Sequence, residues 1–207
     1  MKKNKTHHLK KLQKKHHPKK GDRIKVDPIR NLKDIEKIVK LLKSKPRDLL
    51  FFLMGINNGL RRGDLLKLKV HQVKHCKAGD TVMIKEGKTG KENVLVINKK
   101  VYKALRVYLM TAKLHDEDYL FKSYKGNNAL TIQAVNALIK KWTKGLKGNY
   151  GAHSLRKTWG YIQRKHFGVG YEIICKRFNH TNPAVTMRYL GITDKEVNNI
   201  LQNNEIG

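Results

Sequence analysis

Hydrophobic positions in the first part of the chain recur at helical spacing. Between positions 32 and 44 the apolar residues fall three and four places apart, which puts them on one face of a helix, and Asn31 can cap its first turn. The predicted apolar stripe consists of Leu32, Ile35, Ile38, Val39 and Leu42. A second segment begins at Pro46, is apolar on nearly every side and ends at Asn58-Gly59, so we predict a central buried helix there.

Further along, the pattern changes from helical to strand-like. A short turn is predicted over residues 59–68, and two apolar stretches follow at 80–87 and 92–98. The polar sequence KTGK joins these stretches, and its glycine suits a tight connection. The two stretches are therefore predicted to pair as an antiparallel hairpin.

The second half of the chain returns to helical spacing. Helices are predicted at residues 99–113, 131–144, 153–166 and 170–178. Thr131 is the predicted cap of the second of these. Its inward positions are expected to be Ile132, Val135, Leu138, Ile139 and Trp142. Asn182 followed by Pro183 marks the start of a last helix, and no internal repeat is present, so the predicted fold class is mainly α with a small antiparallel β-sheet (α+β).

The composition adds a strong charge imbalance to this picture. The 207 residues contain 46 Lys and Arg against 16 Asp and Glu, a formal net charge of +30. This balance disfavours an acidic scaffold or a neutral metabolic enzyme and calls for an anionic partner, either nucleic acid or an anionic membrane surface. Hydrophobic residues make up 39% of the chain, which is enough for one core. No apolar run approaches the roughly 18–20 residues of a membrane span, so a cytoplasmic protein is expected.

The positive charge begins at the N-terminus. Residues 1–25 hold eleven Lys and Arg and one acid, and their self-repulsion predicts a disordered basic arm. The domain predicted over residues 26–207 keeps 35 basic and 15 acidic residues, so it is basic in its own right. Two distant cysteines, Cys76 and Cys175, indicate neither a disulfide framework nor a zinc site, and the paired histidines of the arm are a weak metal signal.

Four separated segments carry clustered reactive side chains. They read GLRRGD at 59–64, GKTGK at 87–91, HSLR at 153–156 and NHTNPAVTMRYL at 179–190. Over about residues 31–192 the chain resembles the tyrosine recombinase, or phage integrase, family, because these segments follow that family's order and spacing. The resemblance implies the tyrosine recombinase catalytic-domain fold. It also implies a catalytic set made up of Arg61, Lys88, His153, Arg156, His180 and Tyr189.

These residue types suit attack on a phosphodiester, which is already anionic. Arg61 and Arg156 can donate paired hydrogen bonds to nonbridging oxygens and so stabilise the charge that builds in the transition state. A tyrosine hydroxyl has an ordinary pKa near ~10, so Tyr189 as nucleophile needs a base. His153 lies at i, i+3 from Arg156 and is the predicted base.

The remaining two residues complete the expected reaction. Lys88, at the predicted hairpin tip, is assigned as the general acid, since a long flexible ammonium can reach the leaving 5′ oxygen. His180 is expected to donate a hydrogen bond to phosphate. The product is a 3′-phosphotyrosine with a free 5′ hydroxyl, which can be resealed without ATP. The cationic side chains supply the positive charge, so neither a metal nor a cofactor is predicted.

Each of these residues, taken alone, has an ordinary structural explanation as a surface cation, a loop histidine or a packed tyrosine. Only the six together favour chemistry. Two neighbours depart from the family pattern: Asn179 stands where glycine is customary, and Asp64 where glutamate is common. Asparagine tolerates left-handed backbone, so the turn before His180 is expected to survive. Family members usually carry a separate helical DNA-binding domain in the place that the basic arm takes here.

The last residues, 193–207, are predicted to form a tail helix. Thr193 and Glu196 make a capping box. The apolar face of the tail consists of Val197, Ile200 and Leu201. In the family such a tail docks on a neighbouring protomer, so the resemblance implies a homo-oligomer, a tetramer on DNA.

The leading hypothesis is a site-specific tyrosine recombinase or integrase of phage or mobile-element type, acting on double-stranded DNA, with an accessory protein as a further partner. It would work in the cytoplasm of a bacterial or phage-infected cell, associated with the nucleoid. Three alternatives stay open: a DNA-binding regulator that keeps the fold without recombining, a topoisomerase of the same chemistry, and an RNA-binding or ribosome-binding protein.

Overall fold

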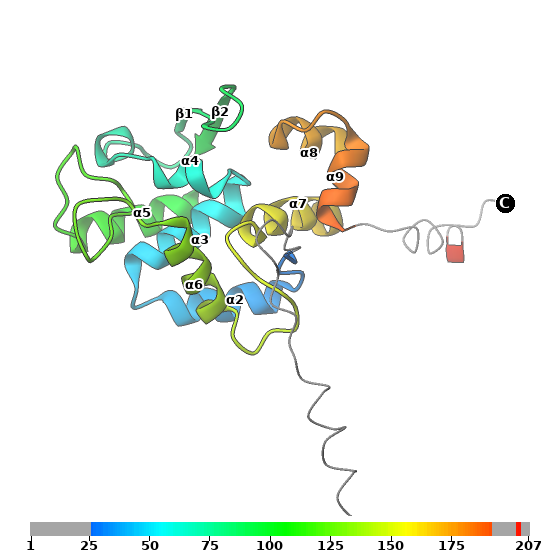
Figure 1. Ribbon diagram of the computed structural model, residues 1–207, viewed down its shortest axis with the longest axis horizontal. Coiled ribbons are helices and arrows are strands. Elements are labelled where there is room, and N and C mark those ends of the chain that lie inside the picture. Colours follow the sequence, from blue (N-terminus) through cyan, green and yellow to red (C-terminus); the bar gives the residue numbers. More distant parts are fainter. Residues whose placement is uncertain (1–25, 192–201, 204–207) are drawn as a thin grey trace, which may run out of the picture.

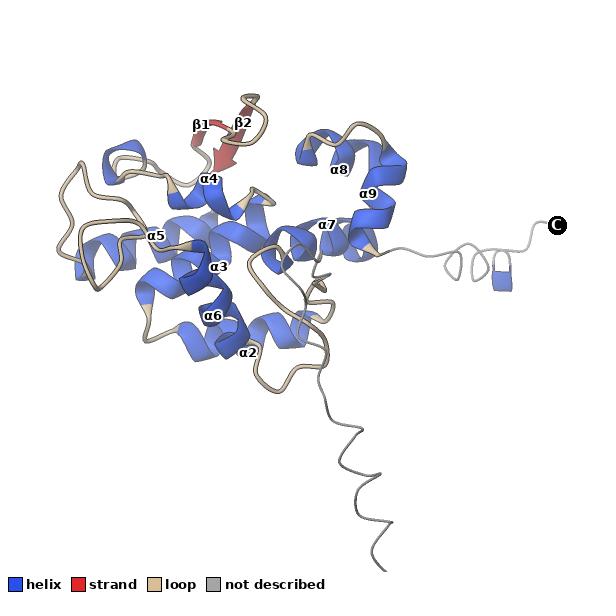
Figure 2. Ribbon diagram, viewed as in Figure 1, coloured by secondary structure: helices blue, strands red, loops and turns tan. Residues whose placement is uncertain are grey.

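The computed structural model describes residues 26–191 and 202–203, so the predicted basic arm and nearly all of the predicted tail lie outside the described residues. The described elements are α2 (Leu32–Leu42), α3 (Pro46–Asn58), α4 (Arg62–Leu66), a 3-10 turn (Val70–Gln72), β1 (Thr81–Lys85), β2 (Glu92–Val96), α5 (Lys99–Thr111), α6 (Ile132–Trp142), α7 (Ser154–Phe167), α8 (Tyr171–Phe178) and α9 (Pro183–Leu190). Figure 2 shows this predominance of helix beside one small antiparallel hairpin. The predicted fold class is confirmed.

Helix ends follow the capping chemistry that the sequence predicts. The Asn31 side chain accepts a hydrogen bond from the Lys33 amide at the start of α2. Thr131 caps α6, and Asn182 caps α9 by accepting from the Val185 amide at 3.0 Å. Such caps satisfy amides that have no partner inside the helix, which fixes where each helix begins.

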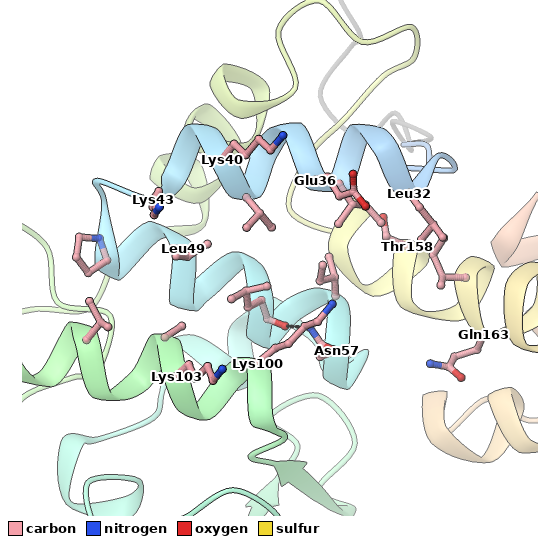
Figure 3. A pocket seen from close by; sticks show the side chains of 18 of the residues that line it. Leu32, Glu36, Lys40, Lys43, Leu49, Asn57, Lys100, Lys103, Thr158 and Gln163 are labelled. Carbon is pink, nitrogen blue, oxygen red and sulfur yellow. Dashed lines mark hydrogen bonds between the residues drawn. The ribbon is translucent and has the colours of Figure 1, made fainter.

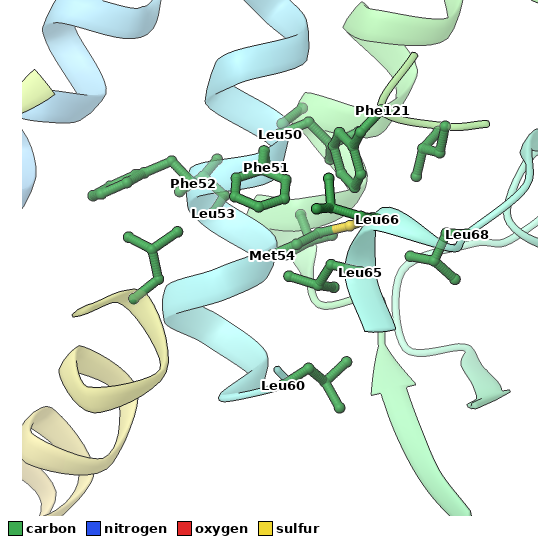
Figure 4. Packing of buried hydrophobic residues seen from close by; sticks show 14 of the residues in the cluster. Leu50, Phe51, Phe52, Leu53, Met54, Leu60, Leu65, Leu66, Leu68 and Phe121 are labelled. Atoms are coloured by element: carbon green, nitrogen blue, oxygen red, sulfur yellow. The ribbon is translucent and has the colours of Figure 1, made fainter. Parts of the chain in front are cut away.

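Helix α3 is the centre of the core, as its apolar sequence predicts. Figure 4 shows Phe51 and Met54 of α3 facing Leu65 and Leu66 of α4, with Phe121 against the same cluster. The rings of Phe51 and Phe121 meet edge to face with centroids 4.9 Å apart. Burial of these large side chains is the main source of stability for a domain of this size.

Three details differ from the sequence predictions. Residues 59–68, predicted as a turn, contain helix α4, a segment too short to be stable alone that is held by burial of Leu65 and Leu66. Leu32 and Ile132, predicted to face inward, are 42% and 41% exposed. Each is the first residue of its helix. A helical side chain leans towards the N-terminus of its helix, so at the first position it leans away from the helix body.

Helices α8 and α9 pack on α7 and form a second, smaller apolar cluster, while α7 also packs against α3 in the main core. Phe178 of α8 and Leu190 of α9 lie against Gly160 of α7, where an added Cβ would come within 2.7 Å of the Phe178 ring. Glycine at this position lets the three helices approach closely. In Figure 1 this cluster stands beside the β1–β2 hairpin.

Arg177 ties this cluster to the hairpin. Its guanidinium donates to the Asn93 side chain at 2.7 Å and to the Val94 carbonyl at 2.8 Å, and its Nε donates to the Asn58 carbonyl at the end of α3. The hairpin, the end of α3 and helix α8 are thereby held together. No helix of the described residues is both long and apolar enough to cross a membrane.

Candidate active site

Arg61 occupies the turn between α3 and α4. Gly59, with φ of 61°, ends α3 in the left-handed region, and Arg61 follows as the N-cap residue of α4. The Arg61 side chain is 18% exposed, and its guanidinium is paired with the fully buried carboxylate of Glu86, the residue after strand β1. This places one predicted phosphate-binding group against the base of the hairpin.

Arg156 is held from two sides. It lies in the first turn of α7, is 3% exposed, and donates to the carbonyl of Gly59 at 2.6 Å and to that of Phe178 at 2.7 Å. Its guanidinium also stacks over the Phe178 ring, 4.3 Å from the centroid. Burial lowers its pKa to about 10, so it remains charged at neutral pH.

His153 immediately precedes α7, and Arg62 contacts it. One guanidinium nitrogen of Arg62 approaches the ring Nε2, so in this arrangement Nε2 acts as the acceptor. Desolvation in the site, reinforced by the charges of Arg62 and Arg156, lowers the pKa of His153 to about 4. The imidazole is therefore neutral near pH 7, which is the state that a general base requires.

The rings of His180 and Tyr189 are in contact. Their ring centroids are 5.2 Å apart in an edge-to-face arrangement, and the His180 Nδ1 lies 2.9 Å from the Thr186 hydroxyl. Asn179, just before His180, adopts φ of 49° and ψ of 41°, so the left-handed turn expected where glycine is customary is confirmed. Burial, followed by the charges of Arg156 and Arg61, lowers the pKa of His180 to about 4.

The Tyr189 hydroxyl is buried next to the Arg156 guanidinium, and within the described part of the chain it makes no well-formed hydrogen bond. Burial raises its pKa, while the guanidinium charges of Arg156, Arg61 and Arg62 act in the opposite direction. The Lys157 ammonium lies over the Tyr189 ring, 4.8 Å from its centroid. The phenol therefore keeps its proton in the resting protein but faces a cluster of cations that would stabilise its ionised form or a bound anion.

Lys88 is placed differently from the other five. It lies in the exposed turn between β1 and β2. The base of this turn is fixed, because the Gly87 amide donates to the Asp64 carboxylate at 2.9 Å. The structure thus brings Arg61, His153, Arg156, His180 and Tyr189 into one neighbourhood and carries Lys88 on the adjoining hairpin; the catalytic roles of all six remain predictions.

Sequence reasoning did not single out two residues of this site, Arg62 and Glu86. Arg62 follows directly after Arg61, so a contact with a histidine 91 positions away carries no local sequence signal. Glu86 sits two residues before Lys88 at the end of an apolar stretch, and an acid placed there was the available sequence signal. Among the described residues, no group of three or more His, Cys, Asp and Glu side chains is arranged to hold a metal ion.

The Arg62 contact gives a direct test of the charge state of His153. Arg62→Gln removes a cation beside the imidazole, so the pKa of His153 is expected to rise from about 4 towards its ordinary value. The measurement is an NMR titration of the imidazole signals between pH 4 and 8. Arg62→Lys, which keeps the positive charge, is the matched control and should stay close to the unchanged protein. Identical titration curves for Arg62→Gln and the unchanged protein would contradict this electrostatic coupling.

Solved structures share this fold. A crystal structure of XerA recombinase aligns with a TM-score of 0.69 at 20% identity, over 87% of this chain and 67% of that one. XerH site-specific recombinase bound to a palindromic difH substrate aligns with a TM-score of 0.69 at 18% identity, over 89% of this chain and 54% of that one.

Sequence relatives point the same way. The probable integrase/recombinase YoeC of Bacillus subtilis is 34% identical over 174 residues, which cover 82% of this chain and 91% of YoeC. Tyrosine recombinase XerA of Pyrococcus horikoshii is 29% identical, and tyrosine recombinase XerC of Caldanaerobacter subterraneus is 28% identical. The chain covers 58% and 50% of their lengths, so it spans little more than half of these two relatives. Residues 31–196 match the phage integrase family, and the chain therefore belongs to this family of tyrosine recombinases.

Proposed function

We propose that this chain is a site-specific recombinase that cleaves and rejoins double-stranded DNA through a 3′-phosphotyrosine intermediate. One observation carries the proposal: among the described residues the buried Tyr189 hydroxyl makes no well-formed hydrogen bond, and it is subject to the charges of Arg156, Arg61 and Arg62. A buried phenol among guanidiniums is costly unless an anion joins them, and a phosphodiester is such an anion. The net charge of +30 would bring DNA to this surface.

In the proposed reaction the scissile phosphate docks between Arg61 and Arg156. The Tyr189 oxygen forms a bond to phosphorus as the bond from phosphorus to the 5′ oxygen breaks. His153, neutral because of its lowered pKa, accepts the phenol proton at Nε2 after the Arg62 guanidinium has moved from that nitrogen to the phosphate. Lys88 gives a proton to the departing 5′ oxygen when the hairpin closes on DNA. The guanidiniums stabilise the charge of the transition state. Reversal of these steps with a second strand completes the exchange.

The proposal is tested with nicked suicide duplexes, in which the released fragment diffuses away and traps the cleaved state. A covalent adduct that carries a 3′ end label and runs slowly on a denaturing gel is expected, together with a free 5′ hydroxyl on the other fragment. Binding without an adduct on any duplex would favour the second candidate, a DNA-binding regulator that keeps the fold. The position of Lys88 in an exposed turn, apart from the other five candidate residues, is the observation that favours this alternative.

Assembly on DNA is also part of the proposal, with residues 193–207 of one protomer docking on its neighbour. A groove of about 710 Å³ supports it; α2, α3, α5 and α7 line this groove (Figure 3). Its apolar lining includes Val107 and Phe167, which are 50% and 66% exposed. Four lysines line it as well, namely Lys40, Lys43, Lys100 and Lys103. The tail has a predicted apolar face and three acids against one lysine, so it complements the groove in both respects.

Deletion of residues 193–207 is expected to weaken assembly on DNA while DNA binding by the monomer remains. Val107→Glu changes a residue that lines the groove and should have the same effect, because it places a charge among the apolar side chains of the groove. Met110→Glu, on the same helix α5 but outside the groove lining, is the matched control. Light scattering of the protein with DNA measures assembly, and unchanged assembly after the deletion would rule out this use of the tail.

The proposed setting is the nucleoid DNA of a bacterial or phage-infected cell. Recognition of the target site would then involve the basic arm of residues 1–25 or an accessory protein.

A further inference from the structure

A buried acid lies in the middle of the cationic site, and the proposed reaction does not use it. Glu86 is 1% exposed, and its carboxylate pairs with Arg61. Acids are seldom buried unless their charge is compensated, so this carboxylate must be held by specific partners.

Two of those partners come from the hairpin itself, one from its turn and one from strand β2. The Thr89 hydroxyl donates to the Glu86 carboxylate at 2.6 Å, and the Asn93 side chain donates to its other oxygen at 2.9 Å. Burial alone would raise the pKa of Glu86, but Thr89, Asn93, Asn179 and Arg61 together lower it to about 2. Glu86 is therefore ionised at every pH at which the protein would work.

Three segments that carry candidate catalytic residues meet at this carboxylate: it pairs with the first, belongs to the second and lies beside the third. Arg61 comes from the turn between α3 and α4, and Glu86 itself stands two residues before Lys88 in the hairpin. Asn179 comes from the turn between α8 and α9 and directly precedes His180. A fixed negative charge at this junction sets where the Arg61 guanidinium points and where the base of the hairpin lies.

We infer that Glu86 is a positioning residue for strand cleavage: its carboxylate holds Arg61 in the orientation that receives the scissile phosphate and anchors the hairpin that carries Lys88. This inference rests on the proposed function. The carboxylate contacts one nitrogen of a guanidinium that has five N–H donors, so donors remain for the phosphate. Glu86 acts through Arg61 and does not itself touch the reacting atoms.

The test compares Glu86→Gln with Glu92→Gln, an exposed acid on the same hairpin, in single-turnover cleavage of a suicide duplex. Glu86→Gln keeps the shape but loses the charge, and cleavage at saturating DNA is expected to slow by about 10- to 100-fold, with DNA affinity changed by less than about threefold. Glu92→Gln should match the unchanged protein. Faster cleavage or tighter DNA binding by Glu86→Gln would overturn the inference, because it would mean that Glu86 only competes with phosphate for Arg61.

A double-mutant cycle separates positioning from general structural support. If Glu86 acts largely through Arg61, adding Glu86→Gln to Arg61→Ala should slow cleavage by clearly less than Glu86→Gln slows it in the unchanged protein, and the remainder is the effect on the hairpin. Losses that multiply would contradict the inference. Glu86→Asp keeps the charge and should recover most of the cleavage rate. It replaces Glu86→Gln in the cycle if Glu86→Gln does not fold. Absence of any adduct in the unchanged protein would instead count against the proposed function itself.

Discussion

Tyr189→Phe is expected to abolish the covalent adduct with DNA completely. Phenylalanine lacks the oxygen that bonds to phosphorus, and the charged groups around it, Arg61, Arg62 and Arg156, are not nucleophiles. Stability should not suffer. Among the described residues the buried hydroxyl makes no well-formed hydrogen bond, so its removal is expected to leave the free energy of unfolding unchanged or to raise it by up to about 1 kcal/mol. DNA affinity should stay within about twofold.

The combination of a lost adduct with retained stability and affinity is what identifies a nucleophile. Tyr171→Phe is the matched control, since Tyr171 lies on α8 and packs against the same small core as Tyr189. The control should form the adduct at the normal rate. Denaturing gels measure the adduct, and thermal unfolding measures stability. An adduct that survives Tyr189→Phe would move the nucleophile to another residue.

Much of this fold is readable from local signals in the chain. The caps Asn31, Thr131 and Asn182 act within three residues of their own position, so the sequence predicts where α2, α6 and α9 begin. The KTGK connection places the hairpin for the same reason. Helix α4 was missed because five residues carry too little periodicity to indicate a helix, and tertiary burial of Leu65 and Leu66 decides it instead.

The candidate site divides in the same way. Its six predicted residues stand in motifs whose order along the chain resembles a known family, so the sequence could name them. The environment of each residue depends on contacts between segments that are distant in the sequence, such as Arg62 with His153 or Arg177 with Asn93. Local sequence patterns do not predict such contacts. The lowered pKa of His153 and the buried charge of Glu86 therefore had to come from the structure.

Arg156→Lys is expected to damage both stability and cleavage, although it conserves the charge. The guanidinium donates from two different nitrogens to the carbonyls of Gly59 and Phe178, and a single ammonium cannot reproduce this planar fork. One buried carbonyl would be left without its donor, which costs about 1–3 kcal/mol in the free energy of unfolding. Arg106→Lys, at an exposed position of α5, is the matched control and should change little.

Cleavage should fall further than this loss of stability alone would explain. The two hydrogen bonds fix the Arg156 guanidinium between the end of α3 and the end of α8. This fixed guanidinium would receive the phosphate. Arg156→Lys is therefore expected to slow adduct formation by about 10²- to 10³-fold. Rates are compared at a temperature where urea titration shows both proteins folded. In the folded protein, only a residue that stabilises the transition state affects the cleavage rate. A normal cleavage rate in a destabilised Arg156→Lys protein would therefore mean that Arg156 has a structural role only. Arg61 would then be the principal phosphate-binding group.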